Sequence, residues 1–141
     1  MTALFAFPVR IYYEDTDAGG VVFYANYLNY YERARTELLR SMGVEQDVLM
    51  RDLGIIFVVR SVQIDYLLPA KFNDLLAVTV AIKQLKSASL VFEQTIKCGD
   101  VLLNTASVRI ACLGLDTLRP KLIPDYLKEL LMHHYSLQPS A

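Results

Sequence analysis

The chain has 141 residues, a length typical of one compact domain, and 54% of them are hydrophobic, which excludes an intrinsically disordered protein. Fourteen Lys and Arg residues against fifteen Asp and Glu residues give a formal net charge of -1. Because no basic stripe is interleaved with aromatic residues, we expect no nucleic-acid partner. The longest apolar stretches reach about eight residues, far below the roughly 20 of a membrane-spanning helix, so we expect no membrane span.

Two features of the sequence concern the cellular compartment. Residues 1–8 have no basic start, no long apolar middle and no small-residue cleavage site, so we expect a cytoplasmic protein. Cys98 and Cys112 cannot form a zinc site and are too few for a disulfide framework, so we expect both thiols to be buried and reduced.

The first third of the chain predicts a strand, a loop and a long helix. Residues 8–15 alternate with a period of two, which predicts a strand. Residues 15–20 combine acidic side chains with two glycines, which is typical of a loop. Over residues 26–42 apolar side chains recur every three or four positions, which predicts an amphipathic helix with Asn26 as its N-cap and Arg35 on its polar face.

Strand patterns dominate the rest of the chain. After a short helix over 44–53, the period of two predicts four strands, over 55–66, 74–85, 89–97 and 101–115. A C-terminal helix is predicted over 125–134. We assign residues 1–135 to one domain and expect 136–141 to be a frayed tail.

These elements predict an α+β fold. One long helix cannot bury its apolar stripe alone, whereas a curved antiparallel sheet of about five strands can wrap around it, and a short C-terminal helix completes the expected fold. We expect the helix tyrosines Tyr27, Tyr30 and Tyr31 in this core, with hydroxyls that reach polar partners. Residues 55–59 are apolar on both faces, and so small a sheet leaves apolar edges, so we expect the chain to assemble with copies of itself.

Few residues of this chain can carry catalysis. The only histidines, His133 and His134, follow the predicted sheet, so a Ser-His-Asp or Cys-His arrangement is not expected. The chain has neither a phosphate-binding loop nor a dinucleotide-binding fingerprint. The remaining candidate is the acidic segment 13–27, just before the long helix.

Asp17 is the candidate catalytic residue of this segment. If the period of two continues, Asp15 and Asp17 point toward the seam between sheet and helix, where an unused carboxylate would cost several kcal/mol. A solvated turn before Gly19 is the alternative, and the acidic pattern alone favours it. The helix start favours function, because its free N–H groups can polarise a carbonyl while Asp17 attacks the acyl carbon or activates water. A thioester suits this weak base because its leaving group is good.

A resemblance to a known family rests on Tyr13-Glu14-Asp15-Thr16-Asp17-Ala18-Gly19-Gly20-Val21-Val22, followed by Tyr27 and Tyr31-Glu32-Arg33-Ala34-Arg35. These residues resemble the hotdog-fold acyl-CoA thioesterases of the 4-hydroxybenzoyl-CoA thioesterase class, in particular their YbgC branch, which is associated with the Tol-Pal system. Stretches 57–60, 66–70 and 89–92 add to the similarity, which covers about residues 8–130.

The resemblance implies a hotdog fold, acyl-CoA hydrolysis without metal or organic cofactor, and homodimers that often pair into homotetramers. By position, Asp17 would be the catalytic carboxylate and Tyr13 would line the same pocket. The backbone near Tyr24 would polarise the thioester carbonyl. Members of the YbgC branch often carry a histidine where this chain has Tyr24, and at this point the sequence resembles the aroyl-CoA branch instead.

The resemblance also implies substrate-binding residues from a neighbouring chain. In family dimers the site lies at the subunit boundary, so residues 57–61, with Val59, Arg60 and Ser61, are expected to complete it. Arg60 is in phase with an apolar series, so either it contacts a phosphate or carboxylate or a bulge turns it to solvent. Lys86 is a candidate for the coenzyme A phosphates, although isolated lysines usually lie on the solvated surface.

The leading interpretation is an acyl-CoA thioesterase, with acyl carrier protein as an alternative carrier of the substrate. A noncatalytic acyl-thioester binding module, or a partner of envelope-associated proteins on the same scaffold, is the second interpretation. A hotdog dehydratase is the third, but it needs a histidine that this sequence does not supply at a suitable place.

Overall fold

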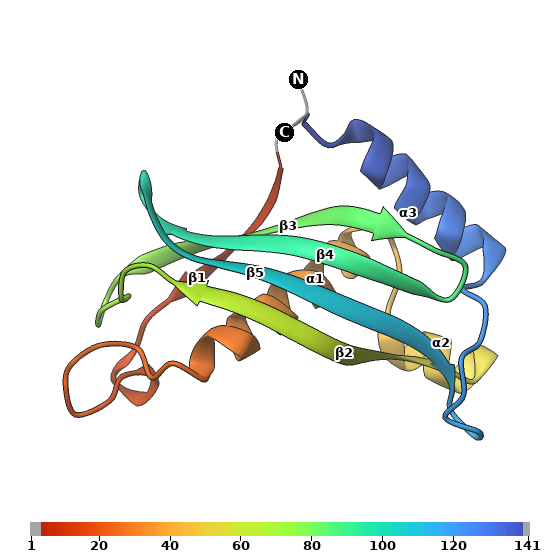
Figure 1. Ribbon diagram of the computed structural model, residues 1–141, viewed down its shortest axis with the longest axis horizontal. Coiled ribbons are helices and arrows are strands. Elements are labelled where there is room, and N and C mark those ends of the chain that lie inside the picture. Colours follow the sequence, from red (N-terminus) through yellow and green to blue (C-terminus); the bar gives the residue numbers. More distant parts are fainter. Residues whose placement is uncertain (1–3, 140–141) are drawn as a thin grey trace.

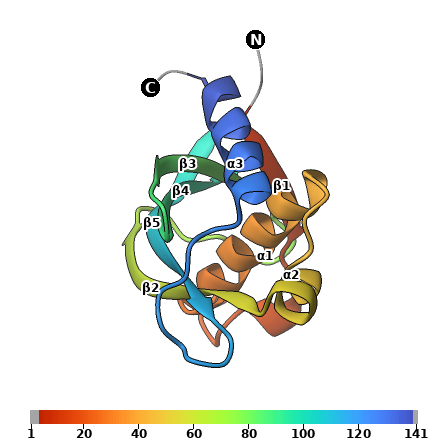
Figure 2. The same cartoon turned by 90° about the vertical axis from the view of Figure 1, so that its right-hand side faces the viewer.

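A computed structural model of the protein describes residues 4–139 and shows an antiparallel sheet curled around one long helix (Figure 1, Figure 2). The strands are β1 Phe5–Arg10, β2 Ile55–Tyr66, β3 Leu75–Leu85, β4 Ser89–Cys98 and β5 Val101–Gly114. The helices are α1 Asn26–Ser41, α2 Gln46–Leu53 and α3 Asp125–Leu137. The strand order β1-β3-β4-β5-β2 makes β1 and β2 the sheet edges. This arrangement confirms the predicted α+β fold.

Helix α1 lies against the concave face of the sheet (Figure 2). Its apolar side chains are spaced by three and four residues and therefore form one stripe, in which Tyr30, Ala34 and Leu38 are at most 1% exposed. Alternate residues of β3, such as Val78 and Val80, are buried completely in the same core. The period of the helix and the period of the strands thus converge on one apolar layer.

Strand β1 begins and ends earlier than the predicted strand over 8–15. Val9 and Ile11 are buried as expected, but the chain then turns through a 3-10 helix, η1, at Tyr13–Asp15. The Asp15 carboxylate stabilises this turn by accepting the N–H of Tyr12 at 2.8 Å. The period of two therefore stops at Ile11.

The N-terminus of α1 differs from the prediction. Ala25, not Asn26, occupies the N-cap position, and it makes no side-chain cap. Asn26 is the first helical residue, and its Nδ2 donates to the backbone oxygen of Asp15 at 2.8 Å. The Asn26 side chain thus ties the helix to the preceding loop.

Two of the three core tyrosines reach polar partners, as predicted. The Tyr27 hydroxyl accepts the N–H of Ala70 at 3.1 Å, and the Tyr31 hydroxyl donates to Oδ1 of Asn104 at 2.6 Å. The Tyr30 hydroxyl is buried and has no hydrogen-bond partner of normal geometry within the described chain. Burial, and then the nearby Asp15 carboxylate, raises the pKa of Tyr30.

The placement of Arg35 on the polar face of the helix was wrong. Arg35 is 9% exposed, and its Nη1 donates to Oε1 of Gln94 at 2.9 Å. Position 35 is four residues after Tyr31 and four before Leu39, so it shares the helix face of these two buried residues. The charge of Arg35 therefore lies under α1 rather than in solvent.

The C-terminal helix α3 packs beside β3 and continues through Leu137, two residues into the predicted tail. The Gln138 side chain then pairs with the backbone of Ile82, accepting its N–H at 2.6 Å and donating to its oxygen at 2.8 Å. Residues 136–138 are therefore ordered rather than frayed, and residues 140–141 lie outside the described part of the chain.

Three general properties of the described chain bear on chemistry. Cys112 is buried, Cys98 is half-buried, and both are free thiols. No helix within residues 4–139 is long and apolar enough to cross a membrane. Over the same range, no three His, Cys, Asp or Glu side chains are grouped so that they could hold a metal ion.

Candidate active site

Asp17 lies in a tight loop that closes where Thr16 pairs with Val22. The Asp17 N–H donates to the oxygen of Val21 at 2.9 Å, and its Oδ1 accepts the N–H of Gly19 at 2.8 Å. A Cβ at position 19 would lie 3.2 Å from that carboxylate oxygen, so glycine leaves room for the contact. The loop therefore holds the Asp17 carboxylate in a defined direction.

Asp17 is exposed in the single chain, which corrects its predicted position in the seam between sheet and helix. The reason is η1, which ends the period of two before Asp17 is reached. Asp15, which was predicted to point into the same seam, is half-buried and so less exposed than Asp17. A site at Asp17 therefore needs another surface to cover it.

The start of α1 supplies hydrogen-bond donors next to this loop. The backbone oxygen of Asp15 accepts hydrogen bonds from the N–H of Phe23 at 3.0 Å and from Nδ2 of Asn26. These two bonds fix the loop against the first helical turn. The oxygen of Phe23 accepts the N–H of Asn26 at 2.9 Å. Within residues 4–139 no acceptor binds the backbone N–H groups of Tyr24 or Tyr27. Such free groups at the positive end of a helix can bind an oxyanion.

The Tyr24 side chain borders an open pocket of about 240 Å³ at this helix start. The hydroxyl of Tyr66, at the end of β2, donates to the backbone oxygen of Tyr24 at 3.3 Å, and the two rings meet edge to face. The other lining residues are mainly apolar: Val22, Tyr27, Leu67, Leu68 and Pro69. The end of β2 thus adjoins the candidate oxyanion donors.

Tyr13 lies in a different groove from the pocket beside Tyr24. Its ring stacks on Phe72 with centroids 3.9 Å apart, and the side chain is 76% exposed. Arg10 lines the same groove, and its Nη1 donates to the oxygen of Asn73 at 2.7 Å. Among the described residues Tyr13 makes no hydrogen bond to Asp17, and Asp17 does not line the Tyr13 groove, so the role of Tyr13 in the site remains a prediction.

Val59, Arg60 and Ser61 lie together on the edge strand β2. Their pairing with β5 shifts between Val59 and Ser61, which leaves Arg60 as an unpaired bulge residue. Arg60 is exposed, so the bulge alternative is the one that the fold adopts. All three residues are available on a free strand edge.

Lys86 lies at the β3–β4 hairpin, at the opposite end of the sheet from the Asp17 loop (Figure 1). The eleven residues of β3 separate the two ends, which is about 36 Å at the usual strand rise. Lys83, near the same end of β3, pairs with Glu93 at 3.0 Å on the surface. One chain alone therefore does not bring Lys86 to Asp17.

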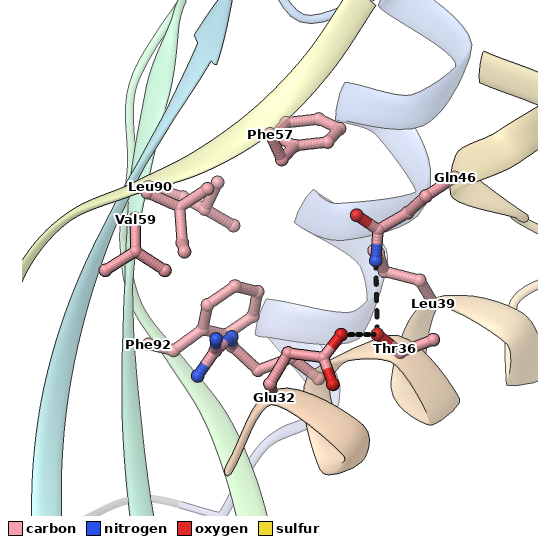
Figure 3. A pocket seen from close by; sticks show the side chains of 10 residues that line it. Glu32, Thr36, Leu39, Gln46, Phe57, Val59, Leu90 and Phe92 are labelled. Atoms are coloured by element: carbon pink, nitrogen blue, oxygen red, sulfur yellow. Dashed lines mark hydrogen bonds between the residues drawn. The ribbon is translucent and has the colours of Figure 1, made fainter. Parts of the chain in front are cut away.

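A second hollow, of about 130 Å³, lies between α1, the start of α2 and the sheet (Figure 3). Figure 3 shows apolar side chains of the sheet on one side and, on the other, a polar chain in which Thr36 links Glu32 to Gln46. Besides these three hydrogen-bonded side chains and Arg35, the lining is apolar: Leu39, Phe57, Val59, Leu90, Phe92 and Ile110. This cavity, called the α1 cavity below, is apolar with one buried cation at its wall.

The α1 cavity was missed by the sequence reasoning. Two signals pointed to it: Arg35 follows Tyr31 by four residues, and Gln94 falls between Phe92 and Ile96 on the buried face of β4. Polar residues inside an apolar periodicity are the places where function or a buried hydrogen bond is expected.

Comparison with known proteins places this geometry in a family. Residues 19–104 match the model of the thioesterase superfamily. The acyl-CoA thioesterase YbgC of Haemophilus influenzae is 43% identical over 129 residues, which cover 92% of this chain and 95% of that protein. The acyl-CoA thioester hydrolase YbgC of Escherichia coli O6:H1 is 44% identical over 124 residues, or 87% of this chain and 92% of that protein.

Solved structures agree on the fold. Protein SAV2348 of Staphylococcus aureus, whose structure contains CoA, superposes with a TM-score of 0.93 over 100% of this chain and 89% of that one, at 20% identity. The curled antiparallel sheet around a central helix is the hotdog fold, and the relatives define the class as a hotdog-fold thioester hydrolase. The chain belongs to the thioesterase superfamily, and the predicted thioester-hydrolase activity and YbgC resemblance are confirmed.

Proposed function

We propose that this chain hydrolyses acyl-CoA with Asp17 as the catalytic carboxylate and the backbone N–H of Tyr24 as a donor to the thioester oxygen. The observation that carries the proposal is a double contact at the backbone oxygen of Asp15. This oxygen accepts hydrogen bonds from the N–H of Phe23 and from Nδ2 of Asn26. It joins the Asp17 loop to the helix start, where the Tyr24 amide has no acceptor within the described part of the chain. A carboxylate and an oxyanion donor are thereby held in one rigid unit.

The chemistry follows from these two groups. The thioester carbonyl oxygen accepts the N–H at the start of α1, and the developing negative charge is stabilised by the helix dipole. Asp17 then either attacks the carbonyl carbon, forming an anhydride that water cleaves, or removes a proton from the attacking water. In both routes the C–S bond breaks, and coenzyme A leaves as a thiolate that is protonated by solvent.

Assembly through β2 accounts for the exposure of Asp17. β2 is an edge strand of twelve residues, so its outer backbone groups are free to pair with another strand. If two copies pair their β2 strands antiparallel, the Tyr66 end of one strand meets the Ile55 end of the other. Tyr66 adjoins the helix start in its own chain, so the second copy's Ile55 end would come to this site.

The same pairing would bring the remote candidates to Asp17. The Ile55 end of β2 pairs with Gly114 of β5, and nearby Cys112 donates its N–H to Ala88 in the hairpin that carries Lys86. Lys86 and residues 57–61 of the second copy would therefore lie on the Asp17 side of the dimer. We propose the homodimer on this basis, with Val59, Arg60, Ser61 and Lys86 contributing to the substrate site across the boundary.

The direct test is release of free thiol from acyl-CoA by the purified chain, screened over short, long and aromatic acyl groups. Asp17→Asn is expected to lower turnover by about 10²–10⁴-fold, the range typical of a catalytic acid or base. Asp100→Asn, in the exposed β4–β5 turn, is the matched control and should leave turnover unchanged. Wild-type turnover in Asp17→Asn would refute the assignment.

Calorimetry of acyl-CoA binding beside the thiol assay also tests the noncatalytic interpretation, which predicts binding without hydrolysis. The homotetramer, the cytoplasmic location, the association with the Tol-Pal system and acyl carrier protein as a carrier stay predictions. Light scattering on the purified protein tests the first of them, and hydrolysis of acyl carrier protein thioesters tests the last.

A further inference from the structure

The α1 cavity contains a buried charge, the guanidinium of Arg35. Arg35 is 9% exposed and lines the cavity, and among the described residues its one hydrogen bond runs from Nη1 to the neutral amide oxygen of Gln94. Within residues 4–139 no carboxylate oxygen lies within 4.0 Å of its guanidinium. A guanidinium has five N–H donors, so most of its hydrogen-bonding capacity is unused by the protein.

The neighbours of Arg35 do not neutralise it. Gln94 is fixed in its orientation, because its Nε2 donates to the backbone oxygens of Tyr31 at 3.2 Å and Thr79 at 3.3 Å. Glu32 also lines the cavity, but it is exposed and its Oε1 accepts the Thr36 hydroxyl at 3.2 Å. Solvent screens such an exposed charge, so Glu32 compensates Arg35 only weakly. Burial lowers the pKa of Arg35, although an arginine stays protonated at neutral pH.

The rest of the cavity is apolar and small. Phe57, Leu90 and Phe92 form the opposite wall, on the sheet (Figure 3), and Ile110 of β5 also lines the cavity. Its volume of about 130 Å³ is close to the roughly 150 Å³ of a protein cavity that holds benzene. A ligand with about three to six carbon atoms beyond one carboxylate would fill it and pair the guanidinium.

We propose that the α1 cavity is a carboxylate subsite, in which Arg35 binds the carboxylate of a short aliphatic or aromatic group that packs against Phe57 and Phe92. Two sources can supply this chemistry: the far carboxylate of a dicarboxylic acyl group, or the free acid that thioester hydrolysis releases. Binding of a carboxylate does not depend on turnover. Only its use in selecting the substrate rests on the proposed function.

The first experiment measures binding of butyrate and benzoate to the purified protein by calorimetry, with butyramide and benzamide as neutral analogues of the same shape. The carboxylates should bind about tenfold or more tightly than the amides, because a hydrogen bond to a charged group is worth more than a neutral one. Equal affinity for the two series, or no binding of either, overturns the proposal. Because no thioester is present, this result is independent of whether Asp17 is catalytic.

Three variants assign the binding to the guanidinium. Arg35→Met should remove the preference for carboxylates, whereas Arg33→Met, an exposed arginine on the same helix, should keep it. Gln94→Glu keeps Arg35 but places a carboxylate where the neutral oxygen now lies 2.9 Å away, so it should also abolish carboxylate binding. Gln94→Glu decides the question if Arg35→Met does not fold. A carboxylate preference that survives in folded Arg35→Met or folded Gln94→Glu refutes the assignment.

A kinetic comparison distinguishes the two sources. If the subsite serves the acyl group, kcat/KM for glutaryl-CoA should fall more than that for pentanoyl-CoA in Gln94→Glu. If it serves the product, both substrates keep their kcat/KM and inhibition by the free acid is lost. An unchanged kcat/KM together with unchanged product inhibition overturns a role for the subsite in the reaction.

Discussion

Tyr31 on α1 donates a buried hydrogen bond of 2.6 Å to Oδ1 of Asn104 on β5, which joins the central helix to the sheet. Asn104 is 1% exposed, and its Nδ2 has no hydrogen-bond partner within residues 4–139. The Tyr31 hydroxyl is therefore the partner of the Asn104 side-chain oxygen. A polar pair of this kind favours one register of the helix on an otherwise apolar sheet.

Tyr31→Phe is expected to lower the free energy of unfolding by about 1–3 kcal/mol, because it leaves a buried amide without its partner. Urea unfolding followed by circular dichroism measures the change, and Tyr135→Phe on exposed α3 is the control. The double variant Tyr31→Phe with Asn104→Leu should lose less than the sum of the single changes, since both polar groups are then gone. Additive losses would mean that the bond does not couple helix and sheet.

Asn26→Ala is expected to lower kcat about tenfold or more while changing KM little. Its Nδ2 contact with the Asp15 oxygen sets the Asp17 loop against the amides of α1, and small displacements of catalytic groups are costly. Steady-state kinetics checks this, with circular dichroism to show that the fold persists.

The matched control is Asn29→Ala, which changes an exposed asparagine on the next turn of the same helix. It should leave kcat unchanged. A wild-type kcat in folded Asn26→Ala would show that the contact serves stability and not the position of Asp17.

The sequence predicted the fold well because its periodicities are long and regular. The buried alternation of β3 and the three-and-four spacing of α1 each point to a single core. Asp17 was misplaced because a 3-10 turn of three residues has no periodicity of its own. The side-chain contact of Asp15 with the Tyr12 amide, which stabilises that turn, has the same sequence signature as a solvated acidic loop.

Arg35 and Lys86 show two other limits of a single sequence. Arginine side chains are usually solvated, so Arg35 was predicted on the polar face of the helix although its position falls on the buried stripe. In the structure Gln94 accepts a hydrogen bond from it there. Lys86 was grouped with Asp17 because of its charge and its place near a strand end, while the strand length places the two residues at opposite ends of one sheet. Chain topology decides such distances, and residue type does not.

Val62→Lys is expected to convert the proposed dimer into a monomer and to abolish turnover together with it. Val62 is 38% exposed on the edge strand β2, and an antiparallel pair of identical strands would bring the two introduced lysines close to each other. Light scattering gives the mass, and the thiol assay gives the activity.

Leu122→Lys, at a position that is 69% exposed outside the sheet, is the control and should keep both mass and activity. An active monomer of Val62→Lys would contradict a site completed across β2. A dimer that persists with full activity would place the interface elsewhere.

Because of His134 on α3, the free energy of unfolding is expected to fall as the pH falls. It is half-buried, its Nε2 has no hydrogen-bond partner within the described residues, and burial, followed by the charge of His133, lowers its pKa. The unfolded chain therefore binds a proton near the ordinary histidine pKa of about 6.5, whereas the folded chain binds it only at lower pH. The stabilising contribution is complete above about pH 6.5 and declines as the pH falls toward the folded-state pKa.

Urea unfolding between about pH 7.5 and 5 should thus show a smaller loss of stability in His134→Gln than in wild type. His133→Gln, at the exposed neighbouring position, should reduce that loss much less. Equal pH dependence in wild type and His134→Gln would assign the acid sensitivity to other groups.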